Sequence, residues 1–188
     1  MACGMETLRG QLLVAAPSLE DPNFARTVVI VGEHNEDGAL GVVLNRPSDT
    51  EVAEAVPDLS DLVEDGEIVH VGGPVQTSAV LVLAEFAEPE QAQQLVVGDV
   101  GFLAVDEEEE EDIVAATALR RARVFAGYAG WGPGQLEAEL AREDWIVEPA
   151  IGEDIFSDDP ETLWSRVLER KGGQYRLLAR MPLDPTVN

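Results

Sequence analysis

A glycine-rich stretch of the chain has residue types that could bind a phosphate. GYAGWGPGQLEAEL, at 127–140, places four glycines and a proline around a tryptophan, between an apolar run and a helical pattern. A dinucleotide-binding G-x-G-x-x-G motif that starts at Gly130 would need a glycine where Gln135 stands. A Walker loop that starts at Gly127 would need a lysine where Pro133 stands. The stretch therefore matches neither phosphate-binding motif.

The helix predicted after these glycines leaves two interpretations of the stretch. Glu137 would lie in its first turn, at the positive end of the helix dipole where a phosphate would otherwise bind. This favours a tight strand-to-helix turn with Trp131 packed over it. The alternative is a surface of Trp131, Gln135 and Glu139 for a ligand or partner.

Metal and nucleophile patterns are incomplete as well. EHNEDG, at 33–38, begins like a calcium loop, but Leu44 holds the position of the closing bidentate acid. The two histidines, His34 and His70, have no i, i+4 spacing, and a single histidine bonds to backbone more often than to a metal. No serine lies in G-x-S-x-G, and the one cysteine is Cys3. We therefore expect no metal and no cofactor, and no catalytic motif indicates an enzyme.

The charge of the chain bears on its partners. There are 12 basic residues against 37 acidic ones, and the net charge of −25 opposes direct binding to nucleic acid. The acidic run DEEEEED, at 106–112, favours the start of a helix near 110–119 over an interaction tail. Arg120, Arg121 and Arg123 are the densest basic cluster and follow these acids, so the sequence predicts no basic patch.

The compartment is inferred from composition. No apolar run approaches the roughly 20 residues that span a bilayer, and the N-terminal residues lack a signal-peptide pattern. A single cysteine agrees with a reducing compartment. We expect a cytoplasmic protein with no membrane partner.

The elements that must position these residues follow from the hydrophobic pattern. Near-continuous apolar runs, typical of strands covered on both faces, occur at 11–17, 27–33, 39–45, 68–75, 79–86, 124–130 and 175–181. Helical patterns occur at 50–56, 59–65, 110–119, 134–143 and 160–171. NEDG, at 35–38, predicts a hairpin, and hence a sheet with at least one antiparallel pair.

These patterns predict an α/β protein of mixed α+β character. We expect a single compact domain over 1–188, with a mixed, largely buried β-sheet flanked by helices. The ends, 1–8 and 183–188, are expected to be mobile.

Four blocks of the sequence together resemble the bacterial YqgE/AlgH family. They are GQLLVAAPSLEDPNFARTVVIVGEHNEDGALGVVLNRP at 10–47, GGPV at 72–75, GYAGWGPGQLEAEL at 127–140 and DIFSDDPETLW at 154–164. The resemblance spans nearly the whole chain. It implies a single cytosolic α/β domain with a mixed sheet. The family is often labelled a candidate transcriptional regulator, and no activity is settled for it.

The resemblance also indicates where a shared site would lie. The polar residues that recur in the family fall here on Asp21, Arg26, His34, Asn45, Arg46, Gln135 and Glu137. Arg46 either presents its guanidinium outward at a strand exit or pairs with Asp21 or Glu137 as a structural bridge.

Two functions follow as hypotheses from these residues. One is an interaction or regulatory module that acts indirectly, through a protein partner, by an exposed face near Arg46, Trp131 and Gln135. The other is a small-molecule-binding protein or enzyme. The candidate binding residues are His34, Asn45, Arg46, Trp131, Gln135 and Glu137. A ligand site predicts that the five polar ones converge in one pocket, whereas an interaction module predicts an exposed patch that contains Trp131.

Overall fold

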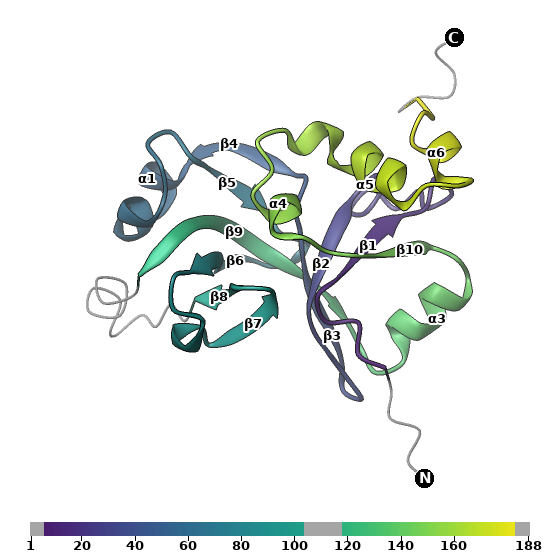
Figure 1. Ribbon diagram of the computed structural model, residues 1–188, viewed down its shortest axis with the longest axis horizontal. Helices are drawn as coiled ribbons and strands as arrows, with labels where there is room; N and C mark the ends of the chain where they lie inside the picture. The colour runs from purple at the N-terminus through teal and green to yellow at the C-terminus, as the bar shows by residue number, and fades with distance from the viewer. Residues whose placement is uncertain (1–5, 104–117, 183–188) are drawn as a thin grey trace.

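A computed structural model describes residues 6–103 and 118–182 as a large sheet with helices on its faces (Figure 1). The strands are β1 (Gln11–Ala15), β2 (Val28–Asn35), β3 (Gly38–Val43), β4 (Pro47–Glu51), β5 (Ile68–Val71), β6 (Val75–Phe86), β7 (Gln94–Val97), β8 (Val100–Leu103), β9 (Leu119–Trp131) and β10 (Trp145–Pro149). The helices are α1 (Val52–Ala55), α3 (Gln135–Ala141), α4 (Gly152–Ile155), α5 (Leu163–Lys171) and α6 (Tyr175–Leu178), with short 3₁₀ turns η1 (Pro57–Leu62), η2 (Pro89–Gln91) and η3 (Pro160–Thr162).

The long strand β9 joins the two halves of the sheet. Its C-terminal end pairs with β3, and the order continues through β2 and β1 to β10. Its N-terminal part pairs with β6, beyond which lie β8 and β7. β5 runs parallel to β9, whereas the other described strand pairs are antiparallel. The predicted mixed sheet and α/β class are thus confirmed.

The predicted burial of both strand faces is also confirmed. In β1, Leu12 and Val14 belong to one core cluster, and Leu13 and Ala15 to another on the opposite face. α5 covers the first face, where the Trp164 indole donates a hydrogen bond to the Ala15 carbonyl at 2.9 Å. α3 covers the second face through Leu136, its one buried residue, which is only 1% exposed.

The hairpin predicted at 35–38 forms between β2 and β3. Asn35 pairs with Gly38, and the Asn35 side chain accepts a hydrogen bond from the Asp37 amide at 2.8 Å. The segment is therefore a turn, as the missing calcium ligand indicated.

The strand predicted at 175–181 is wrong, because this segment is helical. α6 follows Gly172 and Gly173, both at positive φ, which turn the chain back along α5 (Figure 1). Tyr175 and Leu178, three residues apart, pack on the core from one side of a helical turn.

The remaining helix and strand predictions agree only in part with the structure. The helices predicted at 50–56 and 59–65 are only a four-residue α1 and the 3₁₀ turn η1. The sequence patterns missed four short strands, β4, β7, β8 and β10. The helix predicted near 110–119 falls mostly outside the described residues, and β9 already begins at Leu119. In the part of the chain that the structure describes, no helix is long and apolar enough to cross a membrane.

Candidate functional site

The six residues proposed for binding fall into two groups at opposite ends of β2. His34, near its C-terminal end, contacts the carboxylate of Glu137 at 2.6 Å. At its N-terminal end the amide of Val28 donates to the Asn45 side chain at 2.9 Å. Strands rise about 3.3 Å per residue, so the two ends lie roughly 20 Å apart. The prediction that these residues converge in one pocket is therefore wrong.

His34 makes contacts that fix its tautomer. Its Nδ1 accepts a hydrogen bond from the Leu8 amide at 3.0 Å, so the proton lies on Nε2 and is donated to Glu137. This hydrogen bond is the largest of the causes that lower the pKa of Glu137. Both ring nitrogens are thus used within the fold, and residues 6–8, expected in a mobile end, are tied to β2 through Leu8 and Thr7.

Trp131 is not part of an exposed patch, because it is only 6% exposed. One carboxylate oxygen of Glu139 accepts from both indole nitrogens, Trp131 Nε1 and Trp145 Nε1, at 2.8 Å each. The other oxygen accepts from the Gln135 amide at 3.1 Å. The first interpretation of the glycine-rich stretch, a tight turn with Trp131 packed over it, is thus confirmed. The exposed face predicted near Trp131 is wrong.

Glu139→Ala is expected to destabilise the protein by about 2 to 4 kcal/mol, because two buried indole N–H groups would lose their acceptor. Urea unfolding followed by tryptophan fluorescence would measure the loss. Glu139→Gln keeps one amide oxygen as acceptor and should lose less. Equal losses in the two variants would show that the carboxylate does not act through these hydrogen bonds.

The second group of residues organises the loop before β2. Asn45 donates to the Arg26 carbonyl at 2.8 Å, and Arg46 donates to the carbonyls of Pro22 and Ala25. Arg46 therefore neither points outward nor pairs with Asp21 or Glu137; it binds backbone. Both proposals made for it from the sequence are wrong.

Arg26 links this loop to the end of α6. Its guanidinium lies 4.1 Å from the centroid of the Trp164 ring and donates to the carbonyls of Met181, at 3.0 Å, and Pro182, at 2.6 Å. Burial lowers the pKa of Arg26 from its usual value. The polar residues at this end of β2 thus position the segment after α6.

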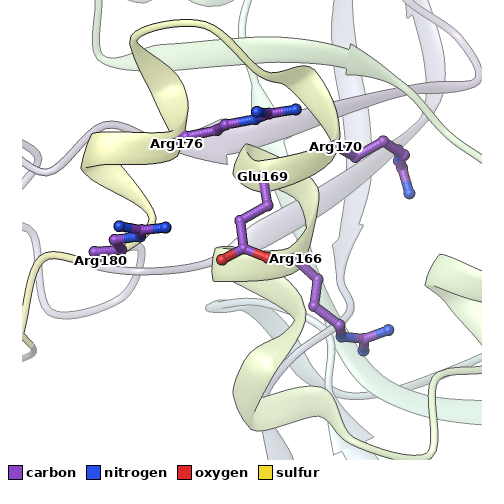
Figure 2. Close-up of a pocket in the computed structure, with 5 residues that line it drawn as sticks. All are labelled: Arg166, Glu169, Arg170, Arg176 and Arg180. Carbon is purple, nitrogen blue, oxygen red and sulfur yellow. The ribbon is translucent and has the colours of Figure 1, made fainter.

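That segment belongs to a pocket that sequence reasoning missed. Arg166 and Arg170 on α5, with Arg176 and Arg180 on and after α6, line a pocket of about 500 Å³ together with Glu169 (Figure 2). We call this set the arginine pocket. In Figure 2 the Arg176 and Arg180 guanidinium groups extend from α6 toward α5. The sequence contains two i, i+4 arginine pairs, 166/170 and 176/180, which would indicate basic helix faces. The second pair was not recognised because 175–181 was predicted as a strand.

The arginines of the pocket differ in how they are paired. Arg170 forms a bidentate ion pair with Asp154 at 2.8 and 2.9 Å, and this hydrogen bonding raises the pKa of Arg170. Arg166 donates to neutral acceptors, the Ser157 and Thr162 hydroxyls and the Asp159 carbonyl. Within residues 6–103 and 118–182, Arg176 and Arg180 form no ion pair and their side chains donate no hydrogen bond.

Two apolar side chains lie exposed beside these arginines. Leu177, on α6, is 73% exposed, and Met181, just after α6, is 42% exposed; each directly follows one of the two arginines, Arg176 and Arg180, in the chain. We call Arg176, Leu177, Arg180 and Met181 the α6 surface.

The cluster predicted as the densest basic one is neutralised instead. Arg121 pairs with Glu85 at 2.7 Å and Glu153 at 2.9 Å. Arg123 is buried and donates to Glu67. Arginines without a carboxylate partner among the described residues instead include Arg166 on α5 and Arg176 and Arg180 on and after α6, a group that the sequence analysis did not single out.

His70 is 2% exposed and lies 5.8 Å from the Phe125 ring, and no metal-ligating group forms among the described residues. Burial, and next the charge of Arg123, lowers its pKa to about 4.

His70 is expected to make stability fall as the pH drops. Its pKa moves from the ordinary 6.5 to about 4 on folding, so between these values the unfolded state binds a proton that the folded state does not. This costs up to about 3 kcal/mol of stability across the window and nothing above it. The unfolding free energies of His70→Gln and wild type should be measured as a function of pH. Their slopes against pH should differ only between about pH 4 and 6.5. Parallel curves would contradict the prediction.

Comparison with known proteins places this fold. A family model described as AlgH-like matches residues 12–176. The chain belongs to the AlgH-like family. A UPF0301 protein of Thermobifida fusca is 44% identical over 97% of this chain and 96% of its own length. One from Streptomyces coelicolor is 42% identical over 98% and 97%.

Two solved structures of other proteins resemble this AlgH-like chain. A crystal structure from Corynebacterium diphtheriae has a TM-score of 0.79 and 28% identity, covering 95% of this chain and 94% of that one. The solution structure of the AlgH protein from Pseudomonas aeruginosa has a TM-score of 0.71 and 34% identity, covering 98% and 100%. The resemblance inferred from four sequence blocks is thus confirmed.

Proposed function

We propose that this AlgH-like chain is a cytoplasmic interaction module that binds a protein partner on the α6 surface. The observation that carries the proposal is the exposure of Leu177, 73%, and Met181, 42%, directly beside two arginines without a carboxylate partner among the described residues. Single exposed apolar residues are common, but protein interfaces combine apolar anchors with arginine. Any effect on transcription would then be indirect, through that partner.

The way in which α6 is held on the rest of the molecule also supports this proposal. Arg26 holds the carbonyls of Met181 and Pro182, and Tyr175 and Leu178 fix the other side of α6 on the core. The exposed side chains are therefore presented by a backbone held at both sides, which lowers the entropic cost of binding.

The small-molecule or enzyme alternative has less support. At one end of β2, His34 bonds to Glu137, and the Gln135 side chain accepts from the Gly132 amide. At the other end, Asn45 accepts from the Val28 amide and Arg46 donates to the Ala25 carbonyl. These polar groups are therefore bound within the fold and do not line one shared pocket.

Site-specific photo-crosslinking tests the proposal. A photoreactive amino acid at Leu177, introduced in the native host, should crosslink one protein, identified by mass spectrometry. The same group at Glu90, which is exposed on η2 beside β7 and β8, is the matched control.

The identified protein is then purified and titrated with the wild type and with Leu177→Ser/Met181→Ser. We expect affinity to fall at least about tenfold, the cost of removing about 1.4 kcal/mol of apolar contact. The same crosslinks at Leu177 and Glu90, or unchanged affinity in the double variant, would refute the α6 surface as the binding site.

A further inference from the structure

The arginine pocket has positive charge in excess of its own acids. Arg170 is neutralised by Asp154, but Arg166, Arg176 and Arg180 have no carboxylate oxygen within ion-pair distance among the described residues. Glu169 is the one acidic side chain that lines the pocket. Figure 2 shows the Arg176 and Arg180 guanidinium groups on the α6 side of Glu169, whereas those of Arg166 and Arg170 point away from α6. Two guanidinium groups beside one carboxylate leave an excess of positive charge there, in a chain whose net charge is −25.

We propose that the pocket binds an aspartate- or glutamate-rich segment of the partner protein, whose apolar side chains contact Leu177 and Met181. This inference rests on the proposed function, because it specifies the chemistry of the partner at the same surface. Guanidinium groups bind carboxylates through two parallel hydrogen bonds, and Arg176 and Arg180 are both available for such contacts. The pocket, of about 500 Å³, is open enough to admit side chains from an extended segment.

The rest of the molecule favours a short acidic segment over a nucleic acid. Charges beyond about 8 Å are largely screened at physiological ionic strength, so a few carboxylates in the pocket respond mainly to its arginines. A duplex carries a charge about every 1.7 Å and extends past the pocket, over a surface that is strongly acidic overall. The acidic surface around the pocket therefore repels a long nucleic acid more than a short acidic segment that lies within the pocket.

Fluorescence anisotropy with a defined probe tests the inference. The probe is a labelled glutamate-rich peptide that carries two leucines, and its control has glutamine in place of every glutamate. At physiological ionic strength, the full-length protein should bind the glutamate peptide and not the glutamine peptide. Arg176→Glu/Arg180→Glu should weaken binding at least about tenfold.

The matched variant is Arg9→Glu/Arg142→Glu, which changes the net charge equally at two exposed arginines outside the pocket. It should bind the glutamate peptide like the wild type. Equal weakening in both double variants would overturn the inference, because only the overall charge would then matter. So would tighter, pocket-dependent binding of a single-stranded RNA oligonucleotide, which would assign the pocket to nucleic acid.

The two proposals can fail separately. If Leu177 crosslinks a partner whose affinity is unchanged by Arg176→Glu/Arg180→Glu, the interaction module stands and the acidic segment is wrong. If no partner crosslinks at Leu177 although the glutamate peptide binds through the pocket, the acidic site stands without the protein partner. Thermal unfolding of each variant is the control for folding, and we expect each to remain folded because the substituted side chains are exposed.

Discussion

Arg123→Met is expected to lose about 3 to 5 kcal/mol of unfolding free energy, which is the cost of breaking a buried, bonded charge. Arg123 is 7% exposed on β9 and donates to Glu67 at 3.1 Å. It also donates to the carbonyls of Ile155, at 3.1 Å, and Ser157, at 2.9 Å. Methionine fills similar volume but donates nothing, so both carbonyls would stay buried without a donor.

Urea unfolding at neutral pH measures this loss, with Arg120→Met as its control. Arg120 lies on the same strand, but its side chain is 56% exposed and its ion pairs are long, at 3.9 and 3.7 Å. Such pairs contribute about 1 kcal/mol or less. Equal losses in the two variants would refute the role given to Arg123.

His70 provides a second readout of the same change. After burial, the charge of Arg123 is the next cause that lowers the pKa of His70 from its ordinary value. Arg123→Met should therefore raise the pKa of His70, measured by NMR titration. A pKa that stays at about 4 would mean that burial alone sets it.

Gly127→Ala is expected to cost about 3 kcal/mol or more, because it combines a left-handed backbone with a blocked side-chain position. Gly127 has a φ of +74°, and a Cβ there would lie 2.5 Å from the Gly73 carbonyl oxygen and 3.1 Å from that of Val75. Both obstacles are backbone atoms, one between β5 and β6 and one at the start of β6, so relief requires that backbone to move.

Gly134 is a closely matched control for this substitution. It has the same φ of +74°, yet nothing lies within 4 Å of the position of its Cβ. Gly134→Ala should therefore show the backbone cost alone, about 1 kcal/mol. Chemical denaturation of both variants separates the two contributions. Similar losses would show that the close approach of Gly127 to Gly73 does not determine stability.

The sequence alone determined the features that depend on neighbouring residues. The apolar runs at 11–17 and 27–33 predicted strands buried on both faces, and β1 and β2 are such strands. The hairpin at 35–38 and the tight turn before α3 were also predicted correctly. Turn chemistry and hydrophobic periodicity act over a few residues, so they can be read from a single sequence.

The tertiary structure decided which distant side chains meet. The apolar residues at 175–181 fit a strand or a helix equally, and only packing of Tyr175 and Leu178 on the core selects the helix. That choice creates the arginine pocket and exposes Leu177.

The partners of the shared polar residues depended on the sheet in the same way. His34 meets Glu137 across 103 positions of sequence, and Arg26 meets Met181 across 155. Such contacts follow from strand register and helix docking, which local patterns do not encode. The sequence alone therefore identified the family and most of its longer strands. The fold decided that the shared polar residues bind one another and the backbone, and that Arg176 and Arg180, which have no carboxylate partner among the described residues, lie on and after α6.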